Sequence, residues 1–216
     1  MFALLIGVVT AAVYSPLLSL TTIRIEGASR VKTADVNRAL SGELGKPLAL
    51  VNFAEVKRQL GAFALIRSYV TETVPPHTLI VRLSERSPIG VIATATGYSV
   101  VDPAGIVIQR VTDRPALTPI IDPGAGGLSG PGFAAAVDVL LALPADVLAK
   151  VDSISAQTKD TVSFSLLGSV QSVVWGGSED SAIKARVLVA LMKTQAPTTS
   201  VRFNVSAPSN PVVGPN

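Results

Sequence analysis

Few residues in this chain could do chemistry, and their types exclude most catalytic and metal sites. Cysteine is absent and histidine occurs once, which rules out thiol catalysis, cysteine-ligated zinc and a multi-histidine metal centre. The one histidine, His77, lies in a proline turn with no serine–glycine elbow or paired acids nearby, so we interpret it as a surface turn residue. The glycine-rich run 124–127 lacks the Gly-Lys-Ser/Thr that follows in a phosphate loop. We therefore expect a protein that is not an enzyme and that holds no cofactor.

One charged pair, Glu85-Arg86, stands at the end of a predicted strand. It is either a recognition pair for a partner or an ion pair that closes the strand at a domain boundary. The second interpretation is favoured, and an exposed pair of this kind contributes about 0–1 kcal/mol to stability.

The composition is that of a folded protein with one apolar segment. Hydrophobic residues make up 48% of the 216 residues and charged residues 15%, and the mean hydropathy is +0.49. These values are too apolar for disorder and too polar for a protein with many membrane spans. The formal net charge is only +3, and no Lys/Arg cluster is interleaved with aromatic residues, so nucleic-acid binding is not expected.

The apolar segment stands at the front of the chain. Residues 1–22 carry no charged side chain, and about 20 apolar residues just cross the hydrocarbon core of a bilayer. We expect residues 1–20 to anchor the protein in the membrane, with Tyr14 at the interface and Pro16 at a kink or at the end of the helix. A cleaved signal peptide and a buried core helix are the alternatives.

Periodicity after the anchor predicts the order strand, helix, helix, strand, strand. Thr22 to Gly27 alternates as a half-buried strand. One helix follows Thr33, and a second follows the cap residue Asn52. Two strands at 66–73 and 79–83 flank a proline turn. A three-stranded sheet with both helices on one face would bury both amphipathic stripes.

The sequence pattern predicts that the second half of the chain is a β-rich domain with two helices. Strands are predicted at 89–95 and 98–101, followed by a long Pro/Gly-rich loop over 112–132. A helix then begins at Pro131. Further strands are predicted at 151–156, 161–166 and 170–175, a second helix begins after Ser178, a last strand covers 200–205, and a Pro-rich tail follows.

These elements resemble a known family. The order β-α-α-β-β, with Ile25-Glu26-Gly27 ending the first strand, resembles a POTRA domain. Val74-Pro75 before the run from Leu79 to Pro88 is similar to the end of the POTRA domain in FtsQ/DivIB division proteins, of the actinobacterial type. Segments of the second half are similar to the β domain of the same family: Tyr98 to Asp102, Gly105 to Ile108, Trp175-Gly176 and Lys184.

The resemblance implies an α+β protein that is anchored in the cell membrane at the division septum, with most of the chain outside the cytoplasm. It implies a transmembrane helix at 1–20, a POTRA domain at 21–88, an open β domain with flanking helices at 89–206 and a flexible tail at 207–216. The implied function is a division scaffold that links early and late division proteins through POTRA and edge-strand contacts.

The family also implies where a partner binds. In FtsQ/DivIB relatives the last strand of the β domain recruits a coiled-coil membrane protein (FtsB/DivIC, with FtsL), since a partner peptide can add a strand at an open sheet edge. The residues that this role would fall on are Arg202, Phe203, Asn204, Val205, Ser206 and Ala207. The alternative is that this strand only closes the sheet. The sequence also departs from the family here, because Asn204-Val205-Ser206 stands where relatives often have Asp-Leu-Arg, which puts contacts of that aspartate or arginine in doubt.

Two other functions are compatible with the sequence. The chain could be a POTRA protein of secretion or outer-membrane assembly, although no β-barrel sequence follows the module. It could also be a secreted hydrolase or binding protein released by cleavage after the first segment.

Overall fold

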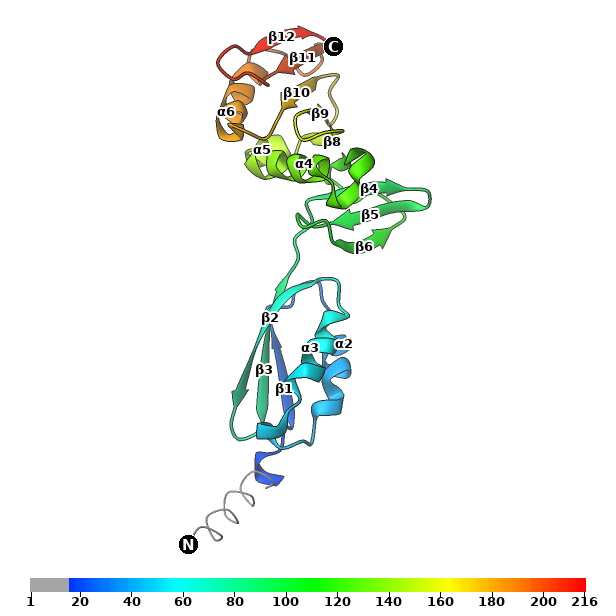
Figure 1. Ribbon diagram of the computed structural model, residues 1–216, viewed down its shortest axis with the longest axis vertical. Helices are drawn as coiled ribbons and strands as arrows, with labels where there is room; N and C mark the ends of the chain where they lie inside the picture. Colours follow the sequence, from blue (N-terminus) through cyan, green and yellow to red (C-terminus); the bar gives the residue numbers. More distant parts are fainter. Residues whose placement is uncertain (1–15) are drawn as a thin grey trace. The chain divides into compact units, whose positions relative to one another are not determined.

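A computed structural model describes residues 16–216 and divides the chain into two compact units (Figure 1). The first unit ends at Arg86 and the second runs from Ser87 to Asn216. Most of the predicted membrane anchor lies outside the described residues. Within residues 16–216, no helix is long and apolar enough to cross a bilayer.

The first unit is a three-stranded sheet with two helices on one face (Figure 1). Its elements are β1 (Thr22–Glu26), α2 (Thr33–Leu40), α3 (Phe53–Gly61), β2 (Ile66–Val74) and β3 (Thr78–Glu85), with short 3-10 turns at Pro16–Leu18, Ser41–Glu43 and Leu48–Leu50. The strand order is β1-β3-β2, with β1 parallel and β2 antiparallel to β3. The predicted order of elements and the α+β class are confirmed.

Alternation along β3 explains which face the helices cover. Leu79, Val81 and Leu83 are buried and pack in one cluster with Val36 of α2 and Val56 of α3. Side chains alternate between the two faces of a strand, so these three residues turn one apolar face to the helices. The glycine after β1, Gly27, has φ +77° and lies so close to the Leu83 carbonyl that a Cβ would collide with it.

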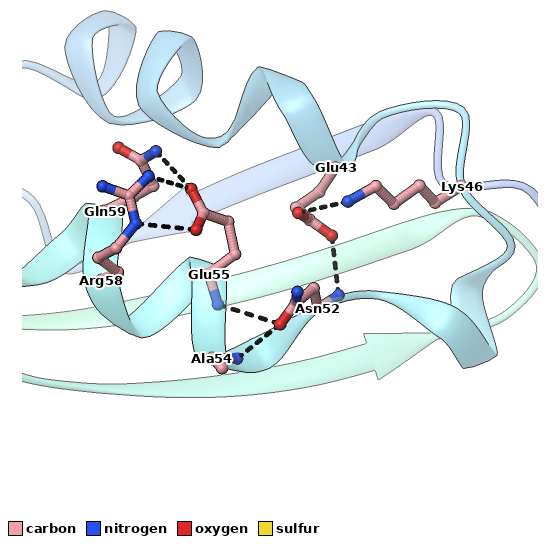
Figure 2. Close-up of polar contacts among 7 residues, drawn as sticks. All are labelled: Glu43, Lys46, Asn52, Ala54, Glu55, Arg58 and Gln59. Atoms are coloured by element: carbon pink, nitrogen blue, oxygen red, sulfur yellow. Dashed lines mark hydrogen bonds and ion pairs between the residues drawn. The ribbon is translucent and has the colours of Figure 1, made fainter.

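A polar cluster fixes the start of α3 (Figure 2). The side-chain oxygen of Asn52 accepts the N–H groups of Ala54 and Glu55, each at 3.1 Å, which confirms Asn52 as the cap. The buried carboxylate of Glu43 accepts the Asn52 N–H at 2.8 Å and pairs with Lys46 at 2.7 Å. Helix α3 is therefore held in place by hydrogen bonds that satisfy its first free N–H groups.

The start of this unit differs from the prediction. Leu20, expected inside the membrane anchor, is 0% exposed in the core of the first unit. Its backbone N–H donates to the Lys46 carbonyl, and its carbonyl accepts the Gly45 N–H, each at 2.8 Å. The first unit therefore begins before residue 21.

The second unit is built on a nine-stranded mixed sheet. The order is β12-β11-β10-β9-β8-β7-β4-β5-β6. Its strands are β4 (Gly90–Thr94), β5 (Gly97–Val101), β6 (Val107–Val111), β7 (Ile120–Asp122), β8 (Val151–Ala156), β9 (Val162–Leu166), β10 (Ser172–Gly176), β11 (Val201–Asn204) and β12 (Val212–Pro215).

Three helices contribute to the core of this unit: α4 (Pro131–Ala142), α5 (Ala145–Leu148) and α6 (Ser181–Met192). Helix α4 contacts β7, β8 and β9. Trp175 is fully buried, with its ring centroid 5.9 Å from that of Phe164. The Lys184 side chain is also buried, and its Nζ donates to the Gly177 carbonyl at 2.9 Å.

Two predicted irregular segments contain strands. The loop expected over 112–132 includes β7, which lies between β4 and β8 and pairs parallel with both. The tail expected to be flexible from residue 207 onward includes β12, which pairs antiparallel with β11. Both strands are short and lie among prolines, which hide them from pattern reading.

Candidate partner-binding edge

The strand predicted to bind a partner, β11, is an inner strand of the sheet. It pairs parallel with β10, where Arg202 faces Ser172, and antiparallel with β12, where Arg202 faces Gly214. The backbone of β11 therefore has a strand on each side. The open edge that the sequence analysis placed at β11 lies one strand further out, at β12.

The six predicted contact residues divide by the face they occupy. Phe203 and Val205 are 0% exposed and belong to the main core of the second unit. Arg202 and Asn204 point to the opposite face, where Arg202 is exposed and Asn204 is half-buried. Ser206 and Ala207 are exposed beyond the strand. Only the outward residues of this set can touch a partner with their side chains.

Short hydrogen bonds hold the turn and the chain end beside this edge. The Asn204 Oδ1 accepts the N–H of Ser206 at 3.1 Å and its hydroxyl at 2.7 Å. At the last residue, the Asn216 Nδ2 donates to the Val170 carbonyl at 2.8 Å, and the Ser172 hydroxyl donates to the Asn216 Oδ1. The first two bonds fix the turn after β11, and the bonds of Asn216 attach the end of the chain to Ser172 of β10 and to Val170 before it.

The outer strand β12 exposes backbone groups and one apolar side chain that a partner could contact. Val212, which faces Asn204, is 53% exposed, whereas Val213 faces Phe203 and packs against the core. Sequence reasoning missed this strand, although the pair of β-branched valines between Pro211 and Pro215 was a signal for it. In the part of the chain that the structure describes, β12 has only β11 as its neighbour, and such an outermost strand carries unpaired backbone groups along its free side.

A row of three serines, an arginine and a glycine crosses the open face of the sheet, which lies opposite the core, and ends at this edge. Ser153, Ser165, Ser172, Arg202 and Gly214 lie side by side on β8 to β12. The hydroxyls of Ser153 and Ser165 are 2.8 Å apart. No hydrogen bond or ion pair within residues 16–216 engages the Arg202 side chain. Because Gly214 has no side chain, the Arg202 guanidinium is unobstructed toward the edge.

Glu85 has a structural role at the end of its strand, but its ion pair is with Arg30, whereas the sequence analysis expected the adjacent Arg86. Its carboxylate accepts the N–H groups of Ser29, Arg30 and Val31 at 2.7, 3.0 and 2.9 Å, and it lies 3.5 Å from the Arg30 guanidinium. Burial alone would raise the pKa of Glu85, but the backbone N–H groups and Arg30 outweigh burial and hold it below the usual value. Glu85 therefore ties the β1–α2 loop to the end of β3.

No metal-binding group of three or more His, Cys, Asp or Glu residues occurs in the part of the chain that the structure describes. His77 lies between β2 and β3, where its carbonyl accepts the N–H groups of Thr21 and Thr22 at 3.0 and 3.2 Å. His77 therefore lies in a turn that is hydrogen-bonded to the start of β1.

Comparison with known proteins agrees with this architecture. Residues 18–86 match the family model described as "POTRA domain, FtsQ-type". The cell division protein FtsQ of Streptomyces bingchenggensis is 32% identical over 98% of this chain and 82% of its own length. FtsQ of Mycobacterium leprae is 31% identical over 96% of the chain, and FtsQ of Mycolicibacterium smegmatis is 28% identical over 99%. The chain spans 59% and 64% of these two mycobacterial relatives. The chain therefore belongs to the FtsQ family of cell division proteins.

Proposed function

We propose that this chain is a membrane-anchored scaffold of the division septum that joins other division proteins without catalysing a reaction. Membership of the FtsQ family supports a role in cell division. The uncharged run that precedes Leu20 supports a single membrane anchor. The resemblance to FtsQ proteins supports placing the bulk of the chain outside the cytoplasm.

The docking site in this proposal is the C-terminal edge of the nine-stranded sheet. A segment of a coiled-coil membrane partner, similar to FtsB/DivIC and acting with an FtsL-like protein, adds as a strand to β12. The observation that carries the proposal is that the sheet ends in β12, which has β11 as its sole neighbour within the described residues. Main-chain hydrogen bonds to a free edge supply affinity, and side chains beside it supply specificity.

Each of the six residues first predicted as contacts has a defined part in this docking. Arg202 and Asn204 contact the partner from the open face. Phe203 and Val205 keep the edge in place through the core. Ser206 and Ala207 lie in the segment that leads to β12 and contact the partner through its exposed surface.

Photo-crosslinking in membranes tests this proposal. A crosslinking amino acid at Val212 or Arg202, both exposed, should capture a small single-span coiled-coil protein. The same group at buried Phe203 or at exposed Gln109 on β6, the opposite end strand of the sheet, should not. Capture from Gln109 alone, or no capture with the protein found free of membranes, would reject the scaffold.

A further inference from the structure

A second binding groove lies in the first unit, between α3 and β2. Its volume is about 430 Å³. Helix α3 contributes Lys57 and Leu60, strand β2 contributes Ile66, Arg67 and Tyr69, and Arg86 lies beyond β3. Leu60 and Ile66 are buried and Tyr69 is half-buried, so the floor is apolar and the cations stand at the rim. None of the described residues that line the groove carries a carboxylate.

The charges of the first unit explain why this rim is positive. Residues 1–86 contain ten Lys/Arg and six Asp/Glu, which gives a formal net charge of +4. All six carboxylates are held in ion pairs, which are Glu26–Arg82, Asp35–Arg38, Glu43–Lys46, Glu55–Arg58, Glu72–Arg82 and Glu85–Arg30. The six acids thus engage five cations, and the excess positive charge is carried by other residues.

Two of those other cations, Lys57 and Arg67, lie at the groove, and their side chains form no ion pair or hydrogen bond within residues 16–216. The acid of α3 cannot neutralise them, because Glu55 is bound by Arg58 and Gln59 (Figure 2). The hydrogen bonds from Arg58 and Gln59 lower the pKa of Glu55 to about 2. The groove therefore presents a field that attracts carboxylates.

The groove also borders an open sheet edge. Strand β2 is nine residues long, stands at the end of the sheet order and, among residues 16–216, pairs only with β3. Its free side carries backbone N–H and C=O groups that an extended peptide can meet. Alternate side chains of an added strand would point toward the helix-covered face, where Leu60, Ile66 and Tyr69 provide apolar contact.

We propose that this groove binds an extended acidic segment of a partner protein, which adds to β2 as a fourth strand. The inference deepens the proposed scaffold function by giving the first unit its own docking edge and its own charge selectivity. The partner segment carries carboxylates that reach Lys57 and Arg67, and it alternates them with apolar residues. A lipid headgroup would meet the cations but would make no use of the strand edge or the apolar floor.

The test uses the full chain in neutral detergent and a fluorescent peptide of alternating Glu and Val, long enough to span β2. Fluorescence anisotropy should show binding of this peptide and at least tenfold weaker binding, on the order expected for two lost ion pairs, to its Lys-Val counterpart. N-methylation along one backbone edge of the Glu-Val peptide should abolish binding, because strand addition needs main-chain hydrogen bonds.

Matched variants separate the groove from general charge. Lys57→Glu with Arg67→Glu should weaken the Glu-Val peptide about tenfold, whereas Arg24→Glu with Lys32→Glu, two exposed cations outside the groove, should leave affinity within about twofold. Gly61→Leu should also block binding without changing charge, since Gly61 lines the groove and a Cβ there meets nothing within 4 Å.

Equal effects of the two double variants, equal binding of both peptides, or full binding of the N-methylated peptide would overturn the proposal. Tighter binding of soluble short-chain phosphatidylglycerol than of the peptide would instead assign the groove to anionic lipid. Capture of a partner at Val212 of β12 would be unaffected by any of these outcomes, so failure here is distinguishable from failure of the scaffold.

Discussion

The two units of this chain both leave a sheet edge open, but they surround that edge differently. In the first unit the edge strand β2 is nine residues long and borders a cationic groove in a region of net charge +4. In the second unit the edge strand β12 is four residues long, and residues 87–216 carry eight basic and nine acidic residues. Both proposed docking sites use a backbone edge for strand addition, so the proposal makes charge the property that distinguishes their partners.

The comparison depends on the two units having separate cores, and the largest predicted effect tests this. Phe203→Ala removes a fully buried ring from the core of the second unit and should lower its free energy of unfolding by about 3–5 kcal/mol. Chemical denaturation followed through Trp175, which lies in the same core, measures the loss.

The first unit supplies the control. Its unfolding, followed by hydrogen exchange of β3, should be unchanged in Phe203→Ala, whereas Leu79→Ala should lower it by about 2–5 kcal/mol and spare the signal of Trp175. Loss of both units in either variant would show one cooperative fold and end the comparison.

A smaller loss of stability is predicted for replacement of Glu85, whose carboxylate holds the β1–α2 loop at the end of β3. Glu85→Gln weakens the bonds to the β1–α2 loop and should destabilise the first unit by about 1.5–3 kcal/mol at neutral pH, the range for hydrogen bonds to charged groups. The side chain of Glu85 is 9% exposed, so water replaces these bonds poorly.

The lowered pKa of Glu85 also predicts a pH dependence. A carboxyl whose folded pKa lies below its unfolded pKa stabilises the fold above the unfolded value, near 4.3, and that stability is lost as the pH falls through the folded pKa. Denaturation series below neutral pH should therefore show the wild type and Glu85→Gln converging in acid. A gap that stays constant down to the acid limit would contradict this role.

The smallest predicted loss of stability distinguishes the capped start of α3 from the uncapped start of α2. Asn52→Ala removes the cap of α3 and should cost about 1 kcal/mol. Thr33→Ala at the start of α2 should cost less than about 0.5 kcal/mol, because no side chain caps that helix. Equal losses by thermal unfolding would mean that the Asn52 contacts to Ala54 and Glu55 add nothing.

The sequence was most informative where local patterns decide structure. Asn52 before an amphipathic run predicted a capped helix because a cap and a 3.6-residue period act locally. The same reasoning could have placed Phe203 and Val205 in the core, since the alternation of β11 puts them on one face. It could not show that β12 covers β11, because strand neighbours are set by contacts far apart in the chain.

Prediction from sequence was weakest where the proposed function depends on which charged side chains form no ion pair in the fold. Lys57 and Arg67 look like ordinary surface cations in the sequence, and only the ion pairs of the six acids reveal them as surplus. Strand β7, three residues long, escaped notice among prolines although it joins the two halves of the large sheet.

The most direct test of the central proposal is amide hydrogen exchange of the full chain, alone and in complex with the partners that copurify from membranes. Docking at the outer edge predicts slower exchange in the complex at those amides of β12 that face away from β11, which alternate along Val212, Val213 and Gly214, because an added strand protects them. Exchange in β6, at the opposite end of the sheet, should not change. Unchanged exchange in β12 with an intact complex would contradict docking at this edge.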